Sequence, residues 1–232
     1  MMHMEQIIHR LKEQQNKKIY FYTPYGLHVY FKDEMLDDTI SVESAVAKYE
    51  SIIPKHLLPN IEMIVFGDFE EFHERGINAF YDSSTIYISN VQDDEADILD
   101  DLIHELSHAI EEQYGYQIYG DRKVHDEFLN KRIHLYKILW EMGFKAPKVF
   151  FQNVEFDREF DEFLHETVGY ETLNNAIKGL FISPYAATSL REYFATAFTD
   201  FYIDSNHNYL KSVSPAVYKK IIMLQKEENL DF

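Results

Sequence analysis

The sequence predicts an α+β fold, with a small antiparallel or mixed sheet followed by a mainly helical C-terminal lobe. Segments rich in aromatic and β-branched residues lie before residue 90, which is typical of strands. From about residue 92 the apolar residues recur at the spacing of a helix. Strands that come first and helices that follow indicate an α+β domain. With 232 residues, 46% of them hydrophobic, the chain is long and apolar enough for one sizeable core.

Turn residues divide the first 90 residues into short elements. Pro24 and Gly26 separate two aromatic segments, and Ser83 with its neighbours separates two more. Ser41 is suited to cap a helix, and Glu43 places a negative charge in its first turn. We therefore expect, in chain order, a short helix at 4–16, two strands within 17–34, a helix at 41–53, a buried strand at 61–69 and a hairpin at 78–90.

The rest of the chain is expected to be helical. In the segment 92–114, apolar residues return every three or four positions and predict a stripe that faces the core. The stripe consists of Leu99, Leu102, Ile103, Leu106 and Ile110. Further helices are expected at 124–142, roughly 155–180, 189–203 and 214–226.

The composition narrows the classes of partner and of chemistry. With 40 acidic and 22 basic residues the formal charge is −18, so a nucleic-acid backbone would be repelled and a basic peptide or a cation is a more natural ligand. The sequence has no cysteine, which excludes disulfides, thiolate metal ligands and cysteine nucleophiles.

Apolar runs of the length of a signal-peptide core or a membrane span are missing from the sequence. This pattern favours a cytoplasmic protein without a membrane partner, although a secreted protein whose signal has been removed would look the same. The oligomeric state is not predicted.

The segment LIHELSHAIEE, residues 102–112, carries the clearest chemical signal. His104 and His108 are four residues apart, so one helical turn brings both imidazoles within reach of a single tetrahedral metal ion. Glu105 follows the first histidine and is suited to take a proton from a water molecule. A catalytic zinc needs a third protein ligand. The downstream candidates are Glu162, His165, Glu166, Glu171 and Glu192.

A second segment, SPYAATSLREYFATAF at 183–198, resembles part of a known peptidase family. Tyr185 lies seven residues before Glu192, which opens the sequence EYFA. Together with the upstream HELSH, this order resembles the zinc-peptidase domain of anthrax lethal factor and the Pro-Pro endopeptidases, over roughly residues 60–225.

The resemblance implies a zincin-like metallopeptidase, a zinc-dependent endopeptidase that hydrolyses peptide bonds in a peptide or protein substrate. It implies that His104, His108 and Glu192 bind one Zn2+ per chain. Glu105 would then be the general base, and Tyr185 would stabilise the transition state.

The resemblance also implies how the chain is divided. Residues 56–232 are expected to form the catalytic domain, in which the hairpin at 78–90 binds the substrate above the active-site helix. Residues 1–55 are expected to form an N-terminal extension, a β-hairpin plus a helix, packed on that domain.

One position departs from the family's pattern. The family commonly has a second glutamate four residues after the ligand glutamate, and this sequence has Thr196 there. We therefore expect either that a histidine ligand has another orienting partner, with Asp101 on the same helix face as the candidate, or that it is held more loosely.

Two other classes of function stay open. ELSH at 105–108 and EFLH at 162–165 are each Glu-x-x-His, the paired motif of di-iron carboxylate proteins, and the same spelling occurs in EEFH at 70–73, in an expected loop. A catalytically inactive zincin-fold protein with a binding or structural role would keep the same residues. The sequence does not predict the cleavage-site specificity, or whether the protein is a toxin, a processing enzyme or a phage protein.

Overall fold

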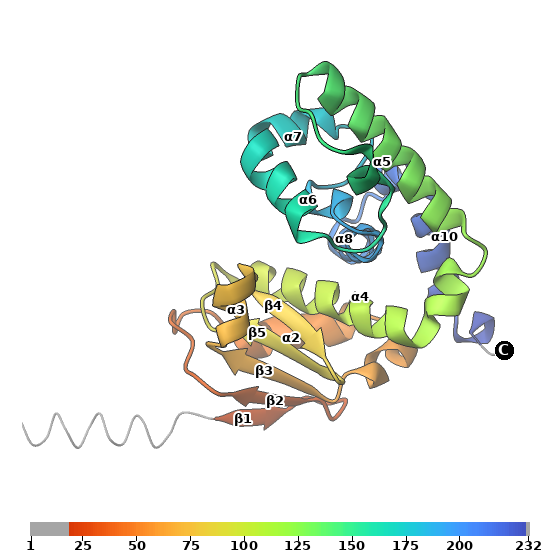
Figure 1. Ribbon diagram of the computed structural model, residues 1–232. Helices are drawn as coiled ribbons and strands as arrows, with labels where there is room; N and C mark the ends of the chain where they lie inside the picture. Colours follow the sequence, from red (N-terminus) through yellow and green to blue (C-terminus); the bar gives the residue numbers. More distant parts are fainter. Residues whose placement is uncertain (1–18, 231–232) are drawn as a thin grey trace, which may run out of the picture.

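A mixed five-stranded sheet forms the first part of the chain, and helices form the rest (Figure 1). The computed structural model describes residues 19–230, so the helix expected at 4–16 lies outside the described residues. The strands are β1 (Tyr20–Tyr22), β2 (His28–Phe31), β3 (Met63–Gly67), β4 (Ala79–Asp82) and β5 (Thr85–Ser89). The helices are α2 (Val42–Ile52), α3 (Glu70–Arg75), α4 (Glu95–Tyr119), α5 (Lys123–Glu141), α6 (Arg158–Glu162), α7 (Tyr170–Ala176), α8 (Leu190–Ile203), α9 (Asn208–Val213) and α10 (Pro215–Leu224). The α+β class expected from the sequence is confirmed.

The strands are ordered β1-β2-β3-β5-β4 across the sheet. The two outer pairs, β1 with β2 and β4 with β5, are antiparallel, while β3 runs parallel to both of its neighbours. Ile64 and Phe66 of the central β3 are fully buried, which confirms the buried strand expected at 61–69. Because β5 pairs with β3, β4 is left at the edge of the sheet.

Both expected hairpins form, and their turns use left-handed backbone. Gly26 has a φ of 87°, and Ser83 and Ser84 have φ values of 48° and 64°. Two consecutive left-handed residues give a two-residue turn the twist that its flanking strands require. The loop between β4 and β5 is therefore as short as a hairpin allows, and β4 is held firmly at the edge.

Helix α4, which carries the H-E-x-x-H motif, packs against β4 and β5 (Figure 1). The side chain of Asp94 caps it by accepting hydrogen bonds from the N–H groups of Ala96 and Asp97. All five residues of the expected apolar stripe are buried. The helix runs on to Tyr119, and Tyr114, with φ −114° and ψ 21°, interrupts it where the sequence predicted its end.

The later helices follow the sequence pattern with two exceptions, one of which is the short helix α9, which was not expected. The helices expected at 124–142, 189–203 and 214–226 are present as α5, α8 and α10, and Ser41 caps α2 as expected. The single helix expected at 155–180 is wrong. That stretch forms α6, a π-helical turn at Phe163–Val168 and α7, which are separated at Gly169. Its φ of 80° lies outside the helical region, so a helix cannot continue through it.

The loop expected around EEFH at 70–73 is also wrong, because these residues begin the short helix α3. Gly76 ends the helix in a left-handed conformation, with φ 64°. A helix of six residues is too short to show a periodic apolar stripe, and only Phe72 among its residues is buried.

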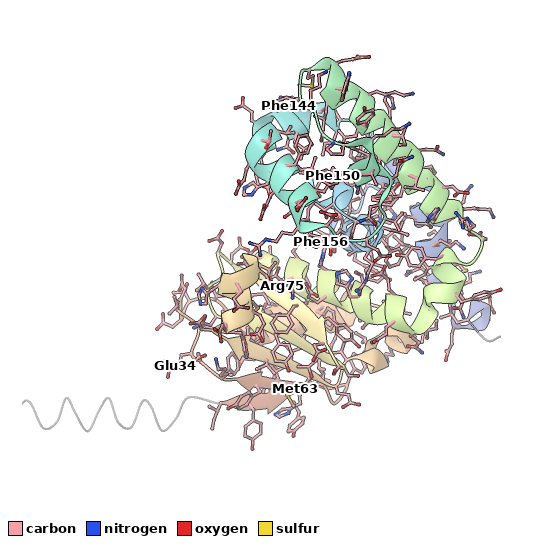
Figure 2. The ribbon with its side chains drawn as sticks, viewed as in Figure 1. Glu34, Met63, Arg75, Phe144, Phe150 and Phe156 are labelled. Carbon is pink, nitrogen blue, oxygen red and sulfur yellow. The ribbon has the colours of Figure 1, made fainter. Side chains whose placement is uncertain are left out.

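Helices α5 to α10 form what we call the helical lobe, and Arg132 lies in its core. Arg132 is 1% exposed and donates hydrogen bonds to the backbone carbonyls of Ala187, Thr188 and Phe150. Its guanidinium also lies 4.1 Å from the centre of the Phe160 ring. Phe150 is labelled in this lobe in Figure 2. The contacts fix the segment that leads into α8, and so the place from which α8 begins.

The sheet joins residues on both sides of position 55. Strand β2 pairs with β3, and Tyr49 of α2 is fully buried in the core that α4 also covers. The division into an extension at 1–55 and a catalytic domain at 56–232 stays a prediction. As for membrane association, a helix with the length and apolar character needed to cross a bilayer is absent from residues 19–230.

Candidate metal centre

Helices α4 and α8 pack together and bring His104, His108 and Glu192 to one place. His104 Nε2 lies 3.0 Å from Glu192 Oε2, and His108 Nε2 lies 3.7 Å from Glu192 Oε1. Glu192 follows His104 by 88 positions, so only the packing of the two helices makes this contact. Of the five downstream candidates that the sequence offered, Glu192 is thus the one that contacts both histidines within the described residues.

Local structure explains why the three side chains converge. The histidines are one turn apart on α4, and their rings lie 5.2 Å apart at 81°. Glu192 is in the first turn of α8, where the side chain of Ser189 accepts a hydrogen bond from its N–H at 3.1 Å. That cap and the Arg132 contacts to Thr188 fix the start of α8 against α4.

The donor set and its spacing fit a zinc ion. Zinc prefers nitrogen and oxygen ligands at about 2.0–2.2 Å in tetrahedral sites, which places the ligand atoms roughly 3.3 Å apart. The two nitrogen–oxygen distances, 3.0 Å to Oε2 and 3.7 Å to Oε1 of Glu192, lie on either side of that value, and each histidine faces a different oxygen of the carboxylate. All three side chains are largely buried, with exposed side-chain fractions of 17%, 11% and 14% for His104, His108 and Glu192.

The charged forms of His104 and Glu192 stabilise each other. Burial favours the neutral form of His104, but the hydrogen bond and charge of Glu192, with the charges of Glu105 and Asp100, raise its pKa. Burial likewise opposes ionisation of Glu192, yet the hydrogen bond from His104 and the charge of His108 lower its pKa. The site therefore favours a protonated imidazole beside a carboxylate, and a metal ion would compete with protons for it.

Glu105 lies beside the histidines and is buried, at 7% exposure. Ligand atoms of His104, Glu105 and His108 lie within 4.8 Å of one another. Burial raises the pKa of Glu105, while the two histidines and a hydrogen bond from the backbone N–H of Tyr81 act in the opposite direction. A carboxylate with a raised pKa in a partly dry site is a stronger base than one in water.

Tyr185 lies on the other side of His104, in a short 3-10 helix at Tyr185–Ala187 before α8. The two ring centres are 6.0 Å apart, and 38% of Tyr185 is exposed. Burial, followed by the charges of Glu192 and Glu105, raises the pKa of its phenol. The hydroxyl therefore stays protonated at neutral pH and can donate a hydrogen bond.

Glu111, not Asp101, orients a histidine of the centre. Glu111 Oε2 lies 2.8 Å from His108 Nδ1, and Glu111 also accepts hydrogen bonds from Tyr119 and, at 3.4 Å, from Arg191. The expectation for Asp101 is wrong. Its Oδ2 accepts a hydrogen bond from Gln92 at 3.1 Å, because it faces the loop before α4.

Sequence reasoning could have found Glu111. It follows His108 by three positions, a spacing that places two side chains side by side on a helix. The roles of Tyr119 and Arg191 had no such signal, because they depend on the packing of the end of α4 and the start of α8.

Comparison of the chain with protein-family models, with curated proteins and with solved structures finds no match. Any functional assignment therefore rests on the geometry of the centre and on the motif.

The second Glu-x-x-His segment does not join this centre. Glu162 pairs with Arg158 at 2.9 Å on an exposed face of α6, and the ring of His165 lies 4.8 Å from that of Tyr170. Within the described residues, His104, Glu105 and His108 form the group of ligand atoms that lie within 4.8 Å of one another, and Glu192 contacts both of its histidines. The two Glu-x-x-His segments therefore do not meet in one place, as a di-iron site would require.

Proposed function

We propose that the protein is a zinc-dependent endopeptidase with a zincin-like fold. His104, His108 and Glu192 are its metal ligands, Glu105 is its general base and Tyr185 stabilises the transition state. The observation that carries the proposal is the convergence of Glu192 with both histidines of the H-E-x-x-H helix, beside the buried Glu105.

Each residue has a separate task in peptide hydrolysis. A bound zinc ion would supply Lewis acidity, which polarises a peptide carbonyl and acidifies a water molecule. Glu105 takes the proton from that water at its carboxylate, as the water oxygen attacks the carbonyl carbon. Tyr185 donates its hydroxyl hydrogen to the oxygen on which negative charge develops. Glu105 then passes the proton to the nitrogen of the leaving amine, which completes the cleavage of the C–N bond.

The edge strand β4 offers a place for the substrate backbone. The N–H of Ser89 bonds to the carbonyl of Asn78 at 2.7 Å, and bonding alternates along an antiparallel pair. The backbone groups of Ala79 and Tyr81 therefore point away from β5. An extended peptide that pairs with this edge would lie along α4, since the N–H of Tyr81 already reaches Glu105.

The metal content of protein purified without chelators or added metal tests the proposal. We expect about one zinc per chain by plasma mass spectrometry, and its loss on Glu192→Ala, which removes one of three ligands. Glu166→Ala, an exposed residue of the same lobe, is the matched control and should keep the metal. About two irons per chain would favour the di-iron alternative, and a chain that binds no zinc even when it is supplied would refute the metal centre.

Glu111→Gln is expected to weaken zinc binding by about 10- to 100-fold, because the amide no longer fixes the charge and orientation of His108. Competition with a chromophoric zinc chelator measures the affinity. Glu112→Gln is the control, since the Glu112 carboxylate contacts the hydroxyl of Tyr81. Equal affinities for the Glu111 variant and the unmodified chain would show that His108 is held by other means.

A further inference from the structure

A cavity of about 350 Å³ opens beside the candidate metal centre. It shares His104 and Tyr185 with the centre, so a molecule bound at the metal has direct access to it. Its volume falls within the range of about 300–1,000 Å³ that is usual for ligand sites. The other lining residues are Asp100, Ile182, Ser183, Thr196, Thr199, Asp200, Ile203 and Asp204.

The charged residues of this lining are all of one sign, apart from the histidine it shares with the centre. Asp100 precedes His104 by one helical turn on α4, about 6 Å along the axis. Asp200 lies near the end of α8, and Asp204 follows its last residue. The carbonyl end of a helix carries partial negative charge, which adds to that of the two carboxylates.

Two of these carboxylates form no ion pair within residues 19–230. Asp100 and Asp200 accept no side-chain hydrogen bond there, and the positive charges that act on them are those of His104 and His207, respectively. Asp100 is exposed and Asp200 is half-buried, and partial desolvation raises the pKa of both groups. Asp121 shows the contrast, since Lys123 at 3.0 Å and Lys220 at 3.2 Å hold its pKa at about 2.

The uncharged walls suit a long flexible side chain. Ile182 and Ile203 supply apolar walls that methylene groups could contact, and Thr196 and Thr199 are small residues of the same lining. Lysine and arginine combine an apolar stem with a charged end, and they bury the stem when the end finds a partner. A short or anionic side chain would leave either the apolar walls or the carboxylates unmatched.

A second pocket, which is lined by His108, differs in charge. It has a volume of about 420 Å³ and contains the cation of Arg191 together with the carboxylates of Asp82, Glu111 and Glu112. Its charges are partly neutralised, because Arg191 contacts Glu111. The two pockets are therefore chemically distinct, and a cation is favoured in the one that His104 lines.

We propose that the cavity lined by Asp100, Asp200 and Asp204 is a specificity subsite that binds the lysine or arginine side chain of a substrate residue next to the cleaved bond. This inference rests on the proposed endopeptidase function. It makes the substrate class a basic peptide, in agreement with the formal charge of −18.

Two alanine heptapeptides test the subsite, one with lysine and one with norleucine at the centre, each with a fluorescent label. For the zinc-loaded enzyme we expect kcat/KM to be about 10- to 100-fold higher for the lysine peptide, the effect of one charged hydrogen bond. Asp200→Asn should reduce this ratio toward one, and Asp126→Asn, an exposed residue of α5, should leave it unchanged.

Binding measured without turnover separates the two proposals. In the Glu105→Gln background, fluorescence anisotropy should show the same preference for the lysine peptide and its loss with Asp200→Asn. Hydrolysis of both peptides at equal rates would overturn the subsite and leave the endopeptidase standing. If the Glu105→Gln variant bound the lysine peptide selectively but the zinc-loaded enzyme with Glu105 cleaved neither peptide, the result would support the cation site and refute the peptidase. Neither cleavage nor binding would refute both.

Discussion

Glu105→Gln is expected to lower kcat by at least about 10³-fold while the metal stays bound, within the range of general acid–base catalysis. The amide has nearly the shape of the carboxylate but cannot take a proton from water. Because Glu105 is buried and its backbone partner Tyr81 is fixed in β4, another base has little access to its place. Cleavage of a mixed peptide pool, followed by mass spectrometry, measures the loss.

The control for this variant is Glu166→Gln, which changes one exposed carboxylate in the helical lobe and should keep full activity. Metal analysis of both variants should find the same zinc content, as expected if Glu105 is not a ligand. Full turnover by Glu105→Gln would remove Glu105 from the chemistry and with it the proposed mechanism.

Tyr185→Phe should lower kcat by about 10²- to 10³-fold and change KM little, as expected for a donor that acts mainly on the developing oxyanion. The ring of Phe keeps the contact with His104, 6.0 Å between ring centres, so only the hydroxyl is tested. Steady-state kinetics on one cleaved peptide give both constants.

Tyr116→Phe is the matched control, because Tyr116 lies on α4 at 86% exposure and away from the metal ligands. It should not change either constant. If Tyr185→Phe raised KM and left kcat as it was, Tyr185 would bind the substrate without taking part in the reaction.

The fold was predictable where one local rule decided the outcome. The apolar stripe of α4 and the turn at Ser83 follow from residue spacing and turn chemistry, and both are confirmed. The prediction of a single helix at 155–180 was wrong because the apolar spacing continues on both sides of Gly169, while the backbone conformation of Gly169 ends the helix. Helix α3 was not predicted because a helix of six residues is too short to show a periodic spacing of apolar residues.

The site was predictable only in part, for a physical reason. One turn of helix fixes the relation of His104 to His108, so spacing alone predicts that pair. The contact of Glu192 depends on how α8 packs on α4, and no periodicity spans 88 positions. The acidic cavity likewise exists only between the two packed helices.

The distribution of the proposed ligands over two helices has a thermodynamic consequence. His104 and His108 belong to the helix that covers the sheet, and Glu192 belongs to the helical lobe (Figure 1). An ion held by all three would bind only when both parts are folded and docked, so binding and folding would be linked. At a free metal concentration 1,000 times Kd, that linkage adds about 4 kcal/mol to the free energy of unfolding. The ion would then hold helix α4 and the helical lobe together, and a chelator would destabilise the whole molecule as well as stop the reaction.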